Sequence, residues 1–228
     1  MKMESKEENK MKHLNIAIDG PAGAGKSTIA KEIARRLGII YLDTGAMYRA
    51  FALKALNQGI SPKDIEGIVA LIEKTKIDIQ YKDGHQIIML DGTDVTNEIR
   101  APKVSESASD VAAIPEVRLM MVRLQRKIAE ENDVIMDGRD IGTYVLPNAN
   151  KKFFITASTK ERAYRRWLEQ KEKGYNTSLE AVEKEIEKRD YNDSNRAFAP
   201  LRKAEDAILI DTTHLNVEEV IELILGYL

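Results

Sequence analysis

Short apolar runs of four or five residues recur along this chain, each bounded by polar or turn-forming residues. Such runs are typical of strands that are buried on both faces of a parallel sheet. The stretches between them place apolar residues at helical spacing, which predicts helices on both faces of that sheet. The pattern predicts an α/β fold with a five-stranded parallel sheet, whose strands are expected at residues 15–19, 39–43, 134–137, 153–157 and 208–211.

Four of the predicted strands end in an aspartate. Parallel sheets bind their ligands beyond the carboxyl ends of the strands. We therefore expect these carboxylates at the functional edge of the sheet rather than in its core. They are Asp19, Asp43, Asp137 and Asp211.

Residues 60–100 break this alternation. The run Ser61-Pro62-Lys63-Asp64 predicts the start of a helix, with proline at its first position. Three short strands are expected after it, separated by Asp-Gly pairs that are typical of hairpin turns, at residues 77–81, 86–90 and 93–96. Because an antiparallel meander does not fit into a parallel core, residues 60–100 are predicted to form a small insert.

Residues 159–200 break the alternation a second time, with a predicted pair of helices. Gly174 predicts the end of the first helix, and Thr177 with Glu180 fits a capping box for the second. One face of the first helix carries Arg162, Arg165 and Arg166.

The apolar stripe of the second helix starts at Leu179 and continues into Arg189 and Asp193. Charged residues that extend an apolar face favour a polar pocket at the end of a helix. The charges also fit a solvated hairpin, because acidic and basic residues stand four positions apart on the first helix. The pattern alone leaves both interpretations open.

These interruptions divide the chain into parts. A core domain is predicted from residues 14–59, 101–158 and 201–228, together with the insert at 60–100 and a helical lid at 159–200. Residues 1–13 are charged and lack the apolar stretch of a secretory signal, so a disordered extension is expected there.

The composition narrows the classes of function. With 43% hydrophobic and 32% charged residues, the 228-residue chain has the composition of an ordinary folded protein. Its net charge of −2 argues against binding nucleic acid through overall basicity. The chain contains no cysteine and no apolar stretch near the roughly 18 residues of a membrane span. We expect a cytoplasmic monomer without nucleic-acid or membrane partners.

The most specific motif is a glycine-rich run between the first strand and the first helix. Glycines let the backbone turn its N–H groups inward, and the helix start adds partial positive charge, so this run predicts a phosphate-binding loop. Lys26 is expected to reach the β- and γ-phosphates of ATP, and Ser27 to hold Mg²⁺. The predicted loop consists of Gly20, Pro21, Ala22, Gly23, Ala24, Gly25, Lys26, Ser27 and Thr28.

Three further clusters follow core strands or lie in the lid, at residues 43–49, 137–140 and 189–196. In the second, Asp137 stands where an acid anchors Mg²⁺ directly or through water. The third, together with Arg162, Arg165 and Arg166, gives five arginines near this part of the chain, and such cations stabilise the charge that develops on a transferring phosphoryl group. Taken one at a time, the first two clusters also fit a helix cap with a surface arginine and a turn with a surface ion pair.

The four segments GPAGAGKST, LDTGAMYRA, MDGRDIGT and KRDYNDSNRAFAP closely resemble bacterial-type cytidylate kinases, from about Asn15 to the end of the chain. This resemblance implies a nucleoside monophosphate kinase that moves the γ-phosphoryl group of ATP to CMP or dCMP. It also implies that the insert binds the monophosphate and that the lid closes over ATP.

The resemblance implies roles for individual residues. The acceptor site would include Thr44, Tyr48, Arg49, Ser109, Arg118, Arg139, Asp140, Arg189, Asp193 and Arg196. The residues nearest to the transfer would be Lys26, Arg139, Arg162, Arg166 and Arg189. Mg²⁺ would be held by Ser27 and Asp137.

Other functions compete with this interpretation. The acceptor could instead be UMP, AMP or shikimate, because a phosphate-binding loop does not identify the acceptor. A nucleotide-driven regulatory switch is a second class, but the chain lacks a guanine-reading Asn-Lys-x-Asp motif. Nucleic-acid binding through the lid arginines is a third class, and it is weakened by the near-neutral charge and by 6% aromatic residues.

Overall fold

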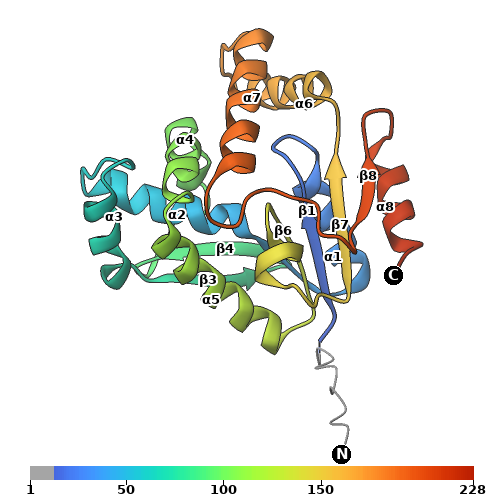
Figure 1. Ribbon diagram of the computed structural model, residues 1–228, viewed down its shortest axis with the longest axis horizontal. Helices are drawn as coiled ribbons and strands as arrows, with labels where there is room; N and C mark the ends of the chain where they lie inside the picture. Colours follow the sequence, from blue (N-terminus) through green and yellow to red (C-terminus); the bar gives the residue numbers. More distant parts are fainter. Residues whose placement is uncertain (1–12) are drawn as a thin grey trace, which may run out of the picture.

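The computed structural model describes residues 13–228, so the extension predicted at residues 1–13 lies outside the described residues except for His13. The described part contains a five-stranded parallel sheet with the order β2-β6-β1-β7-β8 (Figure 1). Its strands are β1 Asn15–Asp19, β2 Ile40–Asp43, β6 Val134–Gly138, β7 Lys151–Thr156 and β8 Ile208–Asp211. The predicted α/β class and parallel sheet are confirmed.

The register of the strands brings their carboxyl ends to one level. Asp43 on β2 lies opposite Asp137 on β6, and Asp19 on β1 lies opposite Gly138. Three of the four predicted edge carboxylates therefore meet at one edge of the sheet. The fourth, Asp211, is exposed and accepts hydrogen bonds from Thr213, so it does not join them.

Helices cover both faces of this sheet. On β1 the side chains alternate: Ile16 and Ile18 pack into one apolar cluster, and Ala17 packs into the other. The first cluster is completed by α1, Lys26–Leu37, and by α8, Val217–Leu225.

The second cluster is completed mainly by three helices. These are α2 Thr44–Asn57, α4 Pro102–Val111 and α5 Pro115–Glu131. The last two start at prolines, because proline at the first helical position removes an N–H group that has no partner there.

The insert contains the predicted meander. Its strands are β3 Ile77–Lys82, β4 His85–Leu90 and β5 Thr93–Asp94, accompanied by the short helices α3 Ile65–Leu71, Ile72–Lys74 and Glu98–Arg100. The prediction that a helix opens at Ser61-Pro62 is wrong. The helix begins at Ile65, because the Asp64 carboxylate accepts the Gly67 N–H at 3.0 Å and caps it.

The apolar residues of the insert share the cluster that contains α2. Ile68, Ile88 and Ile99 are fully or almost fully buried there, together with Phe51 of α2. The insert is thereby packed directly against the helix that follows β2.

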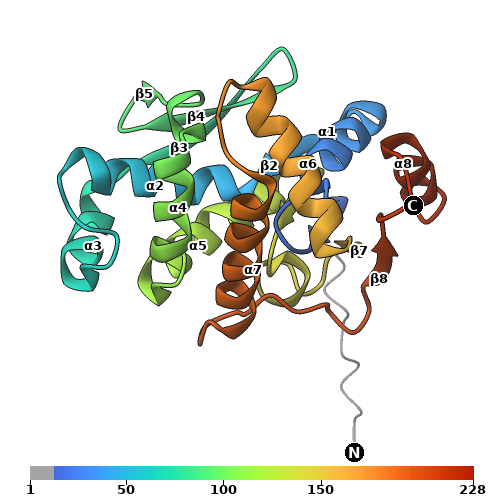
Figure 2. The same ribbon diagram turned by 90° about the horizontal axis from the view of Figure 1, so that it is seen from above.

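The lid is a helical hairpin of α6, Thr159–Glu172, and α7, Leu179–Asn195. Seen from above, it lies between α3 and α8 (Figure 2). Its small apolar cluster, made by Ala163, Val182 and Ile186, is separate from the two clusters of the core.

The predicted capping box of the second lid helix is wrong by one position. Ser178, not Thr177, caps α7 and accepts the Ala181 N–H at 3.2 Å. The Thr177 hydroxyl instead donates to Gln170 at 2.5 Å. This bond links the last turn of α6 to the segment before α7. Between residues 13 and 228 the structure contains no helix of the length and apolarity that crossing a bilayer requires.

Candidate functional site

The glycine-rich loop connects β1 to α1 at the carboxyl edge of the sheet. Gly20 has a φ of 147°, and a Cβ atom there would lie 1.9 Å from the carbonyl oxygen of Ile155. Gly23 has a φ of 77°, and a Cβ atom there would lie 3.0 Å from the carbonyl oxygen of Arg162. Glycine is therefore required at both positions by conformation and by space. The first N–H groups of α1 have no side-chain cap at Gly25, which leaves them available to a phosphate.

Lys26 is buried at the start of α1. Its Nζ donates to the carbonyl oxygen of Pro21 at 2.7 Å. Burial, together with the neighbouring positive charge of Arg139, lowers the pKa of Lys26 to about 7. An anion bound on the loop would stabilise the charged form of this side chain.

The donor set expected for a metal is assembled beside this lysine. The Asp137 carboxylate accepts a hydrogen bond from the Ser27 hydroxyl at 2.7 Å and from the Tyr41 hydroxyl at 2.9 Å. Burial and the nearby carboxylate of Asp43 raise the pKa of Asp137. In residues 13–228 there is no cluster of three His, Cys, Asp or Glu side chains suited to a metal. A hydroxyl and one carboxylate fit Mg²⁺, which takes few protein ligands and completes its shell with phosphate oxygens and water.

The start of α2 lies next to Asp137. The Thr44 hydroxyl donates to the backbone carbonyl of Asp137 at 2.7 Å. Asp43 caps α2 by accepting the Ala46 N–H at 2.8 Å, and its carboxylate also accepts from Arg49 at 3.0 Å and from Arg100 at 3.0 Å. The cluster predicted at residues 43–49 is therefore held against β6 and against the end of the insert.

A second charged group brings four predicted site residues together. Arg118, with 1% of its surface exposed, donates to the Asp140 carboxylate, and Arg196 approaches the same carboxylate at 3.3 Å. The Arg118 guanidinium lies over the Tyr48 ring, 5.4 Å from its centroid. Segments from α2, α5, α7 and the end of β6 thus meet in one place.

Arg139 and Arg189 connect this group to the phosphate-binding loop. Arg139 donates to Asp193 at 2.8 Å, whereas the buried Nε of Arg189 has no hydrogen-bond partner in the described residues. Burial and the charge of Arg139 lower the pKa of Arg189 to about 10. Arg49 also contributes to this decrease, so Arg189 lies among cations without a carboxylate bonded to its Nε.

Arg162 fixes the lid to the loop. Its guanidinium donates to the carbonyl oxygens of Ala157 at 2.9 Å and Ala22 at 3.1 Å, and to Asp190 at 2.5 Å. Arg166 donates to Glu169 at 3.0 Å and also contributes to the lowered pKa of Arg189. The two predicted lid arginines therefore lie near the loop and near Arg189, respectively.

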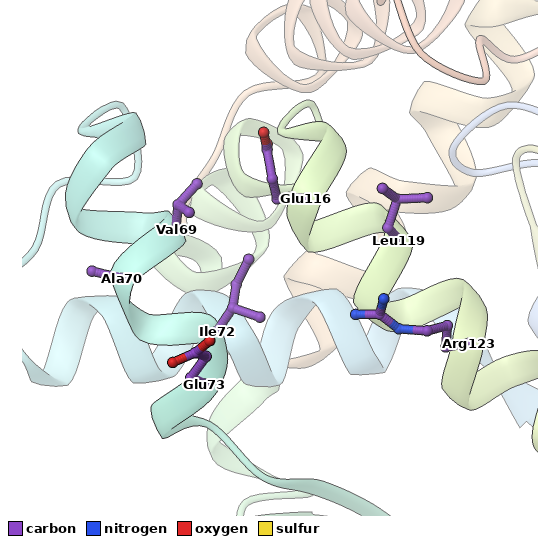
Figure 3. Close-up of a pocket in the computed structure, with 7 residues that line it drawn as sticks. All are labelled: Val69, Ala70, Ile72, Glu73, Glu116, Leu119 and Arg123. Atoms are coloured by element: carbon purple, nitrogen blue, oxygen red, sulfur yellow. The ribbon is translucent and has the colours of Figure 1, made fainter.

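Ser109 lines a groove of about 610 Å³ between α4 and α7. Asp193 and Arg196 line the same groove, so all three predicted residues face one space. A second groove, of about 430 Å³, lies between α3 and α5, where Arg123 of α5 extends toward Ile72 (Figure 3). It contains none of the predicted site residues.

Three residues at the site were not predicted as ligands or partners. Tyr41 bonds to Asp137 and Arg100 bonds to Asp43. Asp19 accepts the N–H groups of Ile141 and Gly142 at 2.8 and 2.7 Å, and burial raises the pKa of Asp19 to about 6. The position of Asp19 at the end of a strand was a sequence signal for its place at the site. The patterns around Tyr41 and Arg100 contain no such signal.

The sequence matches a known protein family and its members. A sequence model of the family described as "Cytidylate kinase" matches residues 16–228. A cytidylate kinase of Caldicellulosiruptor bescii is 57% identical over 215 residues, which cover 94% of this chain and 95% of that protein. A cytidylate kinase of Halalkalibacterium halodurans is 51% identical over 217 residues, which cover 95% and 98%.

Among solved structures, the chain is similar to an uncharacterized protein from Eubacterium ventriosum, with a TM-score of 0.53 at 15% identity. The match covers 94% of this chain and 98% of that chain. At this identity the likeness supports the fold alone.

Proposed function

The chain belongs to the cytidylate kinase family, and from this premise we propose that it transfers the γ-phosphoryl group of ATP to CMP or dCMP, giving ADP and CDP or dCDP. One observation carries the proposal at the level of the site. Arg189 is half-buried, its buried Nε has no partner among residues 13–228, and the charges around it are those of Arg139, Arg49 and Arg166, with Asp193 as the nearby carboxylate. Such an arrangement calls for bound anions.

The donor phosphates belong on the loop at residues 20–28. The free N–H groups at the start of α1 and the Lys26 ammonium provide charge-assisted hydrogen bonds to them. Ser27 and Asp137 would hold Mg²⁺, which neutralises charge on the β- and γ-phosphates when it is bound. Tyr41 fixes the other oxygen of Asp137 and so orients the carboxylate.

The acceptor belongs on the opposite side of Arg139 and Arg189. Arg49 is placed for its phosphate, and Ser109, Asp193 and Arg196 line the groove in which its nucleoside would lie. Cytosine recognition is assigned to the cluster of Tyr48, Arg118 and Asp140, because buried and bonded polar groups reject a base with mismatched donors and acceptors.

The transfer needs alignment and charge stabilisation more than it needs a base. An oxygen of the CMP phosphate forms a bond to the γ-phosphorus while the bond from that phosphorus to the bridging oxygen of ADP breaks. Lys26, Arg139, Arg162, Arg166 and Arg189 are placed to stabilise the charge on the transferring oxygens. Closure of the lid would exclude water, which competes as an acceptor.

A panel of acceptors tests this proposal. With ATP and Mg²⁺, CMP and dCMP are expected to be phosphorylated, UMP much more slowly, and AMP and shikimate hardly at all. Lys26→Ala should lower the rate by several orders of magnitude, whereas Lys127→Ala, an exposed lysine on α5, should leave it unchanged. Equal turnover of AMP and CMP would reject the proposed specificity.

The expected monomeric state and cytoplasmic location stay predictions. Light scattering on the purified protein is the direct check of the first. A mass near 25.7 kDa is expected, and a multiple of it would contradict the expectation.

A further inference from the structure

Asp43 is one carboxylate that faces two guanidinium groups. Arg49 and Arg100 both approach its Oδ2 at 3.0 Å. Burial alone would raise the pKa of Asp43, but the two arginines outweigh that effect and hold the pKa below its ordinary value. The carboxylate is therefore ionised at neutral pH, and the group keeps one positive charge in excess.

Arg100 comes from a different part of the fold than Arg49. It ends the short helix Glu98–Arg100 at the close of the insert, 57 positions after Asp43. The residue before it, Ile99, is fully buried in the cluster shared with α2. In addition, Gln86 on β4 accepts the Asp43 N–H at 2.7 Å. The insert is thus docked on this edge by contacts that do not use the Arg100 guanidinium.

The Arg100 side chain is also open to a ligand. It is 44% exposed, whereas the Asp43 side chain is 8% exposed. Within residues 13–228 the Arg100 guanidinium donates one hydrogen bond, from NH1 to the Asp43 carboxylate. Asp43 therefore fixes the orientation of the side chain and leaves its Nε and NH2 donors for another acceptor.

The next charged groups lead toward the transfer site. Arg49 contributes to the lowered pKa of Arg189, and Arg189 contributes to the lowered pKa of Lys26. A series of cations therefore runs from Arg100 at the insert to Lys26 at the loop. A phosphate monoester brings two negative charges and several acceptor oxygens to such a place, which suits paired guanidinium groups.

We propose that Arg100 binds the phosphate of the acceptor nucleotide beside Arg49, with Asp43 as the positioning residue that orients both guanidinium groups before the nucleotide arrives. This inference rests on the proposed function and adds a ligand from the insert to its acceptor site. Because Arg100 would bind the phosphate, it should contribute to the affinity for nucleoside monophosphates and not to the affinity for nucleosides.

The test is a comparison of Arg100→Gln with the wild-type protein and with Arg123→Gln. Arg123 is an exposed arginine in the groove between α3 and α5, outside the proposed site (Figure 3). For Arg100→Gln, the KM for CMP should rise by about 10- to 100-fold, while the KM for ATP stays within about twofold. For Arg123→Gln, both values should match those of the wild type.

Two further measurements separate binding from folding. Arg100→Lys keeps the charge but loses the planar fork, so its KM for CMP should lie between those of the wild type and Arg100→Gln. Calorimetric titration should show weaker binding of CMP, but not of cytidine, to Arg100→Gln. An unchanged KM for CMP, or an equal loss of CMP and cytidine binding, overturns the inference.

The wild-type protein separates the two proposals. If it phosphorylates CMP and Arg100→Gln does so with the same KM, the inference fails and the proposed function stands. If the wild type does not phosphorylate CMP, the proposed function fails first.

Discussion

Lys26 is a buried cation whose direct partner is a carbonyl oxygen and not a carboxylate. Burial lowers its pKa to about 7, so at pH 8 most of these side chains are neutral in the free protein. Donor phosphates on the loop would bring negative charge to the ammonium and raise that pKa again. Binding of the nucleotide is then coupled to the uptake of a proton by Lys26.

This coupling gives a calorimetric prediction. At pH 8, titration of the protein with ATP in buffers of different ionisation enthalpy should show uptake of close to one proton, because free ATP is already deprotonated there. In Lys26→Met the uptake should largely disappear. A wild-type uptake no larger than that of Lys26→Met would contradict the low pKa of Lys26 in the free protein.

Arg118 is proposed to take part in cytosine recognition, and it should also contribute to the stability of the fold. It is almost fully buried, it donates to Asp140, and its guanidinium lies over the Tyr48 ring. Arg118→Met removes one partner of a buried ion pair and leaves the carboxylate with Arg196 at 3.3 Å. Because Arg196 still compensates the carboxylate, the free energy of unfolding should fall by about 1.5–3 kcal/mol, the contribution of one hydrogen bond to a charged group.

Urea denaturation measures this loss. Arg123→Met is the matched control, and it should change the free energy of unfolding by less than about 0.5 kcal/mol because its side chain is exposed. Equal stability of the two variants would mean that the Arg118–Asp140 pair does not hold α5 to the end of β6.

At the scale of the element, the phosphate-binding loop depends on the strand beside it. A Cβ atom at Gly20 would lie 1.9 Å from the Ile155 carbonyl oxygen on β7, whereas one at Gly38 would meet nothing within 4 Å. Both glycines have positive φ angles, of 147° and 67°. A comparison of alanine substitutions at Gly20 and Gly38 therefore distinguishes a clash with β7 from the cost of the backbone conformation alone.

Gly38→Ala should lower the free energy of unfolding by about 1–2 kcal/mol, which is the cost of the left-handed conformation. Gly20→Ala should lower it by clearly more and should also raise the KM for ATP, because the loop must move away from β7. Thermal denaturation and steady-state kinetics measure both effects. Similar losses for the two variants would show that the contact with β7 does not limit the loop.

The elements themselves were largely predictable because their signals are local. Apolar runs, four of which end in aspartate, predicted the five core strands to within two residues. The errors occur where two capping residues stand close together. Ser61 competes with Asp64, and Thr177 competes with Ser178, and the choice depends on side-chain contacts that the local pattern does not contain.

The site was predictable for the same reason, up to a limit. Its motif residues lie in the lid or on segments that follow core strands, so their meeting follows from the fold. Tyr41 and Arg100 reach the site across 96 and 57 positions of sequence, through the pairing of β2 with β6 and the packing of the insert on α2. No periodicity or motif around either residue encodes these distant contacts.

At the scale of the whole molecule, the core, the insert and the lid meet at one edge of the sheet. The core supplies the loop with Lys26 and the Asp137 carboxylate, and the insert supplies Arg100. The lid has its own apolar cluster, and it reaches the core through polar bonds of Arg162 to the loop and of Asp193 to Arg139. Polar contacts of this kind exchange partners more readily than packed side chains, which suits the proposed closure of the hairpin over ATP.

The central claim is that a donor pocket and a cytidine-monophosphate pocket face each other across this edge. The most direct measurement is the dissociation constant of an analogue in which five phosphates link adenosine to cytidine. Linking turns the second binding event into an intramolecular one, so the analogue should bind at least about 100-fold more tightly than ATP or CMP, and both Lys26→Ala and Arg49→Ala should weaken it. An analogue that binds no more tightly than ATP alone would contradict the facing pockets.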